Sequence, residues 1–436
     1  MGSHVAAAGV TLTAATSSSR PVANDVEAVD LRWDPLLVCV AGFTLTSVGR
    51  VHQLFGMLEP FRLAVLTGLL ALGYYIADAL DERRLRRVFV PTTKYVALLL
   101  AWMILSVPGS LSEGMAFDMV FGNFVKTALM YIIAAAAIRG IRDVERLAAI
   151  YLASAAIYAA VIITRFDIGD GSDWRLGHLY YYDANDFATL AVTAIPFGLY
   201  FLHVARSMAL RALIAASLTI LTLAFVWSGS RGGFLALTAV GIFVVARYRE
   251  IPLRWRISAT ALVLVVLLGT ASDQYWEQMG TITSESDYNR TGETGRLQIW
   301  ERGIGYMLGH PVLGVGPSNF QTAEGTISPL AERQQFGIGV RWSAAHNTFI
   351  QAGAELGLPG LFFFSMMLVT AFRAQRDSFR NASRSMDTGR GPELTRALTA
   401  SLIGFLIGSL FLSLTYSEML YALLAMVVGL NKVTTA

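Results

Sequence analysis

Apolar residues along this chain gather in long runs separated by short polar stretches rich in arginine. A helix needs ~20 apolar residues to cross the hydrocarbon core of a bilayer, and about twelve runs approach that length. They cover residues 35–49, 61–80, 94–108, 119–138, 147–164, 184–204, 209–227, 232–247, 257–271, 349–372, 396–415 and 417–431. The shorter runs would tilt or extend into the interface. Because helices satisfy their own backbone groups in lipid, the pattern predicts an all-α polytopic membrane protein.

The spacing of these runs divides the chain into four predicted regions. Residues 1–34 are rich in Ala, Ser, Thr and Val without periodicity, which predicts a disordered cytoplasmic tail. Residues 35–271 would hold transmembrane helices 1–9, and residues 272–345 one large outer loop with amphipathic helices. Residues 346–436 would hold transmembrane helices 10–12 and a cytoplasmic C-terminus. No short apolar core with a small-residue cleavage site is found, so we expect no removable signal peptide.

The positions of the cations predict the orientation. Most of the 34 Lys and Arg residues fall in every second loop or near the termini. Those loops are residues 81–94, 139–146, 203–211, 247–256 and 373–396. Because cytoplasmic loops of membrane proteins carry the excess of Lys and Arg, we expect these loops and both termini to be cytoplasmic. The few cations in the opposite, outer loops therefore become candidates for function.

Composition supports the same class of protein and excludes others. Hydrophobic residues make up 54% of the chain, charged residues 15%, and the mean hydropathy is +0.52. The net charge of +3 comes mostly from the cytoplasmic arginines, so it indicates anionic headgroups as neighbours and membrane lipids as partners, with no nucleic acid expected. The single cysteine, Cys39, lies in the first run and excludes an intramolecular disulfide.

The tight connection Trp227–Gly233 is the first candidate for an anion site. Its glycines permit a sharp turn, and a helix that starts near Gly232 would aim its free N–H groups at the outer surface. Arg231 next to this helix start, with the hydroxyl of Ser230, would favour a negatively charged ligand at headgroup level. The alternative is an arginine that only extends to the membrane interface.

A second outer segment, residues 289–302, predicts an amphipathic helix that lies on the membrane. From Thr294, a possible N-cap, apolar residues recur at helical spacing at Leu297, Trp300, Ile304 and Met307. Arg296 would fall in the first turn, where a cation opposes the helix dipole, so it is a candidate for ligand binding. An ordinary surface arginine remains the alternative. The Gly- and Pro-rich stretch 309–320 then predicts a compact turn in which His310 is structural.

His346 stands where the outer loop enters the apolar run 349–372. A helix that begins near Ser343 would place it in the first turn, where the positive end of the dipole disfavours imidazolium. Such a histidine is neutral at pH 7 and can accept a proton as a general base. A neutral base beside fixed cations at a bilayer surface suits chemistry on a lipid-borne anion. Considered by itself, a histidine at the start of a helix is more often a satisfied polar residue than a catalyst.

Taken in order, these motifs resemble those of the O-antigen ligase superfamily of bacterial envelope glycosyltransferases. The resemblance covers about residues 170–365. It rests on Arg175-Leu-Gly177, Asp183-Ala-Asn185, Ser228–Gly233, Thr294-Gly-Arg296 with Trp300, Pro311–Phe320, Ala345–Thr348 and Glu355–Gly360. It implies a GT-C-like fold and a periplasmic, metal-independent, inverting transfer of a glycan from undecaprenyl diphosphate. Arg231 and Arg296 match the essential arginines of that superfamily, and His346 matches its essential histidine.

Other cations are candidates for the diphosphate on chemistry alone. Arg290 lies between the motifs, Lys126 lies inside an apolar run, and Arg165 and Arg175 lie in the loop before the run 184–204. A charge within a membrane span is a functional hypothesis by default, although Lys126 could simply extend to the interface. The acidic residues of the outer loops are scattered, so we expect neither a metal site nor a cofactor.

The resemblance leaves the acceptor open. An O-antigen ligase would transfer the glycan to a sugar of lipid A–core, whereas an O-antigen or exopolysaccharide polymerase would extend another lipid-linked glycan. We favour the ligase because the chain has one sizeable outer loop and no added domain. A lipid or solute transporter is the alternative from another class, but it should place ionisable groups near the bilayer midplane on several helices.

Overall fold

The computed structural model describes residues 2, 33–78, 80–165, 174–176, 179, 181–336, 339–384 and 390–435. The chain divides into two units, Met1–Trp33 and Asp34–Ala436, and the architecture below is that of the second. The tail expected at residues 1–34 lies almost entirely outside the described residues.

The described part of the chain is helical and contains no strand, which confirms the all-α class. The longer helices are α2 (Pro35–Ser47), α4 (Leu63–Ala77), α6 (Pro91–Ser106), α8 (Val125–Ala137), α9 (Ile141–Arg165), α10 (Ala184–Val204), α11 (Met208–Ser228), α12 (Arg231–Arg247), α13 (Leu253–Thr270), α16 (Arg296–Gly309), α18 (Thr348–Arg384), α19 (Arg390–Ser409) and α20 (Glu418–Thr435). The shorter ones are α3 (Val51–Leu54), η2 (Gly56–Phe61), η3 (Asp81–Arg83), α5 (Leu85–Val88), η4 (Val107–Gly109), α7 (Glu113–Phe117), η5 (Asp118–Phe124), α14 (Asp273–Gly280), η6 (Thr281–Thr283), α15 (Tyr288–Thr291), α17 (Phe320–Thr326) and η7 (Ala331–Phe336).

Among the described residues, eight helical stretches are long and apolar enough to cross a membrane. They are Gly56–Ala77, Pro91–Gly109, Glu113–Ala137, Ile141–Arg165, Ala184–Val204, Met208–Ser228, Leu253–Thr270 and Thr348–Arg384. The other four predicted runs are helical too, in α2, α12, α19 and α20. The chain is therefore a polytopic helical membrane protein, and about twelve crossings stays a prediction.

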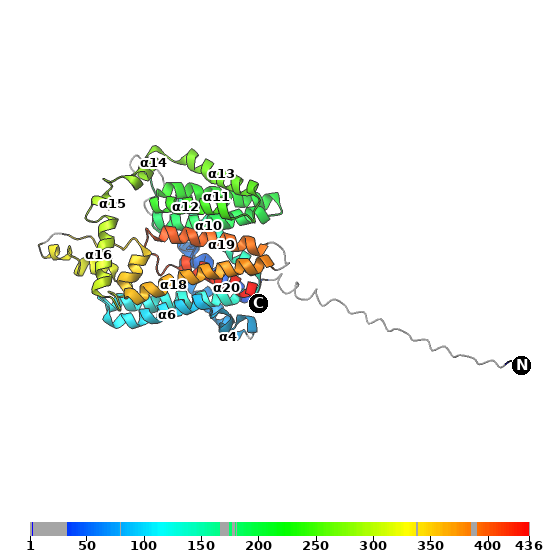
Figure 1. Ribbon diagram of the computed structural model, residues 1–436, viewed down its shortest axis with the longest axis horizontal. Helices are drawn as coiled ribbons and strands as arrows, with labels where there is room; N and C mark the ends of the chain where they lie inside the picture. The colour runs from blue at the N-terminus through cyan, green and yellow to red at the C-terminus, as the bar shows by residue number, and fades with distance from the viewer. Residues whose placement is uncertain are drawn as a thin grey trace. The chain divides into compact units, whose positions relative to one another are not determined.

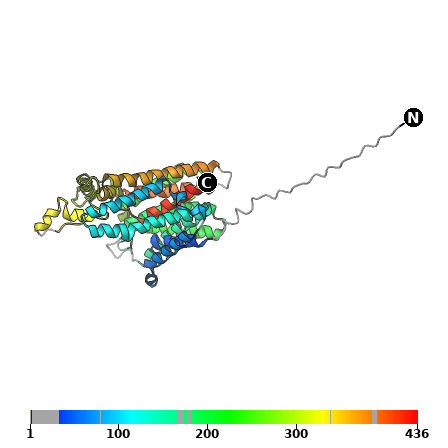
Figure 2. The ribbon, with the colours of Figure 1, turned by 90° about the horizontal axis from the view of Figure 1, so that it is seen from below.

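The helices pack side by side around α10 and α18 (Figure 1). α10 contacts α9, α11, α12 and α19, and 83% of its apolar window is buried inside the protein. α18 contacts α6, α16, α19 and α20. The segment from α14 to α16 lies at one end of this bundle, and Figure 2 shows the same arrangement from below. This end carries the loops that the charge pattern assigns to the outer side.

Helix α18, which covers the predicted run 349–372, is not straight. Gly357 has φ 68° and ψ −170°, so a kink separates the first turns from the rest of the helix. At the kink, the N–H of Leu358 donates to the carbonyl of Pro311 at 2.9 Å. A Cβ on Gly357 would lie 2.3 Å from the carbonyl oxygen of Val312, so only glycine fits this close approach. The kink thus docks α18 onto the turn that follows α16.

The predicted run 396–415 was wrong at its end. α19 stops at Ser409, and residues 410–417 form a non-helical segment before α20 begins at Glu418. This segment is bonded to the start of α18: the hydroxyl of Thr348 donates to the carbonyl of Leu412 at 2.8 Å and accepts the N–H of Leu414 at 3.0 Å. These bonds replace those of a helix, and they hold residues 410–417 against the start of α18.

Candidate functional site

The start of α12 supplies the first site residue, Arg231. Gly229 has φ 57°, and a Cβ there would lie 2.7 Å from the Trp174 ring, so a glycine is needed for the turn. Ser230 is the N-cap, and its buried hydroxyl accepts the N–H of Gly233 at 3.1 Å. Arg231 then occupies the first helical position, as the sequence predicts. The Ser230 hydroxyl accepts this capping bond, and its proton is left to donate, so its role in ligand binding stays a prediction.

The guanidinium of Arg231 is held by the outer loop. Its Nη1 donates to Asp287 Oδ2 at 2.7 Å and to Thr281 Oγ1 at 2.6 Å. Burial raises the pKa of the Asp287 carboxyl, but hydrogen bonds from Asn289 and Arg231 outweigh this and hold that pKa below its usual range. Asp287 is therefore an anion at neutral pH, and it neutralises part of the charge of Arg231.

Arg175 joins the same corner from the segment before α10. Its Nε donates to the carbonyl of Ser228 at 2.5 Å, and its Nη2 donates to Asn185 Oδ1 at 3.1 Å. Burial lowers the pKa of Arg175, and the charge of Arg231 lowers it further, against the opposing effects of Asp183 and Tyr288. The two arginines are thus close enough to repel each other.

Arg296 is the first residue of α16, which begins after Gly295. The expected N-cap, Thr294, was wrong because Gly292 and Gly295 form a turn, with the Gly295 N–H bonded to the Gly292 carbonyl at 2.7 Å. Within the described part of the chain, the Arg296 guanidinium has no hydrogen bond or ion pair; its Cζ lies 5.9 Å from the centre of the Phe411 ring. Burial lowers its pKa, and the charges of Arg231 and Arg175 lower it further, although Tyr288 and Asp183 oppose this.

These side chains border a cavity of about 240 Å³ at the start of α12. Arg231, Arg290 and Arg296 line it, with Trp300 and Phe411 among its apolar walls. Arg290 comes from α15 and is exposed. We call this space the arginine cavity. The charges of its half-buried arginines are only partly neutralised by carboxylates. Because a guanidinium group can form two parallel hydrogen bonds to phosphate oxygens, this cavity suits a phosphate or diphosphate group.

His346 lies before α18, and the expectation that it occupies a first helical turn was wrong. The helix begins at Thr348, because the Asn347 carboxamide caps it by accepting the N–H groups of Phe349 at 2.9 Å and Ile350 at 3.1 Å. His346 has φ 46°, which is outside the helical range, and its N–H donates to Ser413 Oγ at 3.0 Å. Within the described residues, its imidazole has no hydrogen bond.

The surroundings of His346 favour the neutral imidazole. Burial lowers the pKa of His346 below its ordinary value, and the charges of Arg296 and then Arg341 lower it further, against the opposing effect of Asp183. The lowered pKa of His346 agrees with the neutral imidazole expected from the sequence. Its causes are burial and nearby arginines, whereas the sequence pattern predicted the dipole of a helix as the cause. A half-buried neutral imidazole without a hydrogen-bond partner is able to accept a proton from a bound hydroxyl group.

Two candidates lie apart from this group. Lys126 is the second residue of α8, is exposed and does not line the arginine cavity. Arg165 ends α9, donates from Nη1 to the carbonyl of Leu54 and lies over the Phe55 ring with its Cζ 5.4 Å from the ring centre. The structure therefore brings Arg175, Arg231, Arg290, Arg296 and His346 together.

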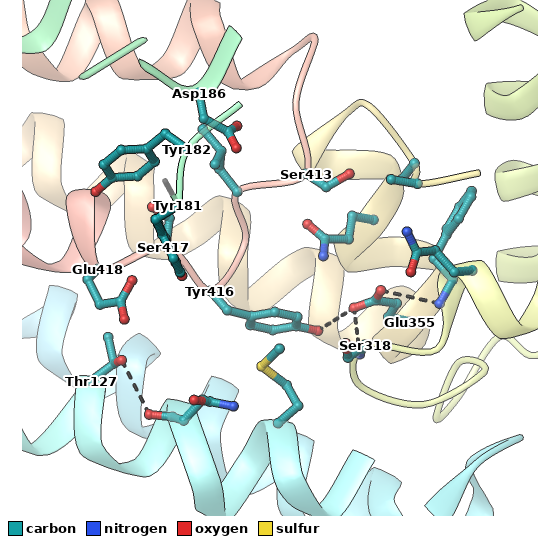
Figure 3. Close-up of a pocket in the computed structure, with 18 residues that line it drawn as sticks. Thr127, Tyr181, Tyr182, Asp186, Ser318, Glu355, Ser413, Tyr416, Ser417 and Glu418 are labelled. Carbon is teal, nitrogen blue, oxygen red and sulfur yellow. Dashed lines mark hydrogen bonds between the residues drawn. The ribbon is translucent and has the colours of Figure 1, made fainter. Parts of the chain in front are cut away.

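Residues that sequence reasoning missed form a second, larger cavity of about 440 Å³ beside His346 (Figure 3). Its walls include Ser413 and Glu418, which fall in the predicted membrane runs 396–415 and 417–431, and Tyr416, which lies between those runs. The sequence did indicate this region. The stretch Ser413-Leu-Thr-Tyr-Ser-Glu418 is mostly polar, and the two predicted spans that meet there would be separated by only one residue. We call this space the acidic cavity, after its carboxylates.

Glu355, inside α18, anchors one side of the acidic cavity. Its Oε2 accepts the N–H of Ser318 at 3.0 Å and the hydroxyl of Tyr416 at 2.7 Å, and its Oε1 accepts the N–H of Phe320 at 3.3 Å. Figure 3 shows the Tyr416 ring reaching toward this carboxylate. One buried carboxylate thereby joins α18, the turn after α16 and the 410–417 segment.

Part of the chain that carries this geometry is similar to known proteins. Residues 215–365, which include Arg231, Arg296, His346 and Glu355, match the profile of the O-antigen ligase family. A curated relative, the exopolysaccharide production protein ExoQ of Rhizobium meliloti (strain 1021), is 33% identical over 126 residues, which are 29% of this chain. The chain spans about a quarter of that relative's length, 26%. The resemblance to the O-antigen ligase superfamily is confirmed over the matched segment.

Proposed function

We propose that this protein is a periplasmic O-antigen ligase of the bacterial inner membrane. It transfers a polysaccharide from undecaprenyl diphosphate to a sugar of lipid A–core, without a metal or other cofactor. The observation that carries the proposal is the placement of His346, whose imidazole has no hydrogen bond among the described residues, next to a group of incompletely neutralised arginines. The match of this segment to the O-antigen ligase family supports it, and also favours an enzyme over a transporter.

The reaction follows from the two kinds of side chain. The diphosphate of the donor would bind in the arginine cavity, with Arg231 and Arg296 as its main partners and Arg175 and Arg290 nearby. When the bond between the anomeric carbon and the diphosphate oxygen breaks, the electron pair stays on that oxygen. Fixed guanidinium groups stabilise the charge that develops there. Arg296, which has no partner among the described residues, is free to make this contact.

His346 would act on the acceptor. As the acceptor hydroxyl attacks the anomeric carbon, its proton passes to an imidazole nitrogen, and a new carbon–oxygen bond replaces the bond to the diphosphate. The proton then leaves to solvent, which restores the neutral imidazole. A single displacement of this kind inverts the anomeric centre.

The second candidate is a polymerase that extends a lipid-linked glycan. The observation that favours it is the curated relative, whose printed name refers to exopolysaccharide production. Both reactions use the same donor and the same base, so they differ only in the acceptor.

The test is a transfer assay with the purified protein in detergent. Lipid-linked O-antigen is supplied with lipid A–core in one reaction and alone in another, and products are separated by size. Product on lipid A–core supports the ligase, whereas lengthened lipid-linked glycan supports the polymerase. The His346→Ala protein, shown to be folded, is the control. Absence of either product with the folded unmodified protein would reject both reactions.

A further inference from the structure

The acidic cavity and the arginine cavity are lined by neighbouring residues of the 410–417 segment. Phe411 lines the arginine cavity, and Ser413 and Leu414, two and three residues later, line the acidic cavity. Ala344 and Ala345, which precede His346, also line the acidic cavity. The backbone N–H of His346 donates to the hydroxyl oxygen of Ser413. The backbone of His346 is therefore adjacent to residues that line the acidic cavity.

The lining of the acidic cavity differs from that of the arginine cavity in charge. Asp186 and Glu418 face it from the starts of α10 and α20 (Figure 3). Within the described part of the chain, no lysine or arginine lines it. Arg50 lies behind Glu418 at 3.2 Å from Oε2, with its Cζ 3.4 Å from the centre of the Tyr181 ring. This cation neutralises part of the carboxylate charge and fixes the aromatic ring at the cavity edge.

The hydrogen-bonding groups of this cavity suit a ligand rich in hydroxyl groups. Carboxyl oxygens accept hydrogen bonds from hydroxyl groups, and a protonated carboxyl group also donates one. The Glu355 carboxylate is already engaged by three donors, which leaves Asp186 and Glu418 to accept from a ligand. Ser413 accepts the His346 N–H, so its own hydroxyl proton is left to donate. A phosphate or carboxylate would meet Asp186, which has no ion pair among the described residues, and Glu418, whose charge Arg50 neutralises only in part. This disfavours such ligands.

We propose that the acidic cavity binds the terminal sugar of the acceptor glycan and selects an uncharged sugar. The inference rests on the proposed function. The sugar would present one hydroxyl past Ser413 toward His346, opposite the diphosphate in the arginine cavity. This arrangement supplies the geometry that an inverting displacement requires, with nucleophile and leaving group on opposite faces of the anomeric carbon. The volume of about 440 Å³ falls within the usual range of small-ligand sites, ~300–1,000 Å³.

The first experiment measures transfer kinetics at varied acceptor concentration for Asp186→Asn and Glu418→Gln. Each substitution keeps the shape of the side chain and removes its charge. We expect the acceptor KM to rise about 10- to 100-fold, the value of a lost hydrogen bond to a charged group, with the donor KM unchanged within about twofold. Asp273→Asn, at an outer position away from both cavities, is the matched control. An acceptor KM within about twofold of the unmodified value in both variants would overturn the proposal.

A second experiment fills the cavity from an exposed position. Gln321 lines it from α17 and is exposed, so Gln321→Trp should block the space without disturbing the core, and Gln321→Ala is its control. Transfer by Gln321→Trp should fall at least tenfold at subsaturating acceptor, while binding of undecaprenyl diphosphate is retained. Full transfer by the tryptophan variant would count against an acceptor in this cavity.

A third experiment tests the choice of charge and separates this inference from the proposed function. Binding of maltotriose, and of an equally long trisaccharide that ends in glucuronic acid, is measured on the purified protein by thermal shift without donor. We expect only the neutral probe to bind, and Gln321→Trp to abolish its binding. In Asp186→Asn/Glu418→Gln, the preference for the neutral probe should fall. If the unmodified protein binds maltotriose but transfers no glycan, the sugar site is supported and the proposed reaction is rejected. If it transfers glycan but binds both probes equally, the reaction is supported and the proposed sugar site is rejected.

Discussion

Arg231 and Arg296 carry the same charge, but the protein neutralises them differently. Arg231 donates to Asp287 at 2.7 Å, whereas Arg296 has no hydrogen bond or ion pair among the described residues. A guanidinium bound by a carboxylate is held in place, and one without a partner must be satisfied by water or a ligand. The two residues should therefore contribute differently to donor binding.

Removal of Arg296 should weaken donor binding with little effect on stability. We expect Arg296→Ala to lower transfer by about 10²–10³-fold, the usual effect of losing one donor to a developing negative charge. Arg296→Lys should restore only part of it, because a point charge lacks the guanidinium fork. Arg231→Ala should lower both transfer and the melting temperature, since it removes the ion pair of the Asp287 carboxylate and leaves that group, among the described residues, only the hydrogen bonds from Asn289.

Transfer assays and thermal unfolding of these three variants check the distinction. Asp287→Asn serves as the control for the ion pair: it should lower the melting temperature in the same way as Arg231→Ala, yet keep more of the transfer activity. Full activity of Arg296→Ala would place the diphosphate elsewhere, with Lys126 and Arg165 as the next candidates.

The arginines also predict how the reaction responds to chelators. If guanidinium groups stabilise the leaving diphosphate, excess EDTA should leave the transfer rate unchanged within about twofold. Among the described residues, no three His, Cys, Asp or Glu side chains gather as a metal site would require. The rate is compared with and without EDTA, and after addition of Mg²⁺ or Mn²⁺. Loss of transfer in EDTA that either ion restores would falsify the arginine-only mechanism.

His346 predicts a rate that depends on pH in one direction. Burial and the charges of Arg296 and Arg341 lower its pKa below the ordinary value, so the neutral, active imidazole persists to pH values below ~6.5. As the pH falls through this lowered pKa, imidazolium forms and transfer should decrease. Arg341→Ala removes one of the causes, so its acidic limb should move to higher pH. A profile unchanged by Arg341→Ala would contradict this electrostatic account.

Substitution of His346 separates catalysis from binding. His346→Ala should lower the transfer rate by ~10²–10⁴-fold, the usual contribution of a general base, while undecaprenyl diphosphate binds as before. His346→Gln keeps polarity but cannot accept the proton at neutral pH, so it should be equally slow. Donor affinity is measured beside the rate; a collapse of affinity would instead assign His346 to the diphosphate site.

At the scale of elements, short non-helical segments bring the site together. Gly357 allows α18 to kink against the turn after α16, and residues 410–417 bond to the start of the same helix. Glu355 joins these parts through Ser318 and Tyr416. The positions of His346 and Ser413 thus depend mainly on the kink at Gly357 and on the non-helical conformation of residues 410–417.

The kink gives a prediction about stability. Gly357→Ala places a Cβ 2.3 Å from the Val312 carbonyl oxygen, at φ and ψ values that are essentially restricted to glycine. We expect a loss of about 1–3 kcal/mol or more, seen as a lower melting temperature in detergent. Gly305→Ala, at an exposed position in α16 with nothing within 4 Å, is the matched control and should be neutral or stabilising. Equal melting temperatures for the two variants would show that the kink carries no such constraint.

The same segments mark the limit of what could be predicted from the sequence. Apolar runs long enough to cross a membrane predicted the helices, because hydropathy follows directly from side-chain chemistry. The ends of those runs were harder: the apolar residues Phe411, Leu412 and Leu414 lie in a non-helical segment, since side-chain hydrogen bonds from Thr348 replace the helical ones. The meeting of Arg175 with Arg231 depends on contacts between distant segments, and no local pattern encodes it.

At the scale of the whole molecule, both cavities lie at one end of the bundle, on the side that the charge pattern predicts to be periplasmic. α10, α18 and α20 begin at this end. Asp186 lies in the first turn of α10, and Glu418 lies in the first turn of α20. The same end carries the arginine cavity at the start of α12. A lipid-borne donor would thus meet Arg231 and Arg296 at the headgroup level, and the acceptor would enter from the aqueous side.

Orientation is testable with single cysteines in a Cys39→Ala background, which removes the one natural thiol. Gln321→Cys lies in the segment between α13 and α18, and Ser383→Cys lies exposed near the far end of α18. Because the arginine-rich loops should stay in the cytoplasm, a membrane-impermeant maleimide should label Gln321→Cys in intact spheroplasts and Ser383→Cys only after lysis. The reverse pattern would put His346 and both cavities in the cytoplasm, where lipid A–core presented on the periplasmic face is out of reach, and the proposed reaction would fail with it.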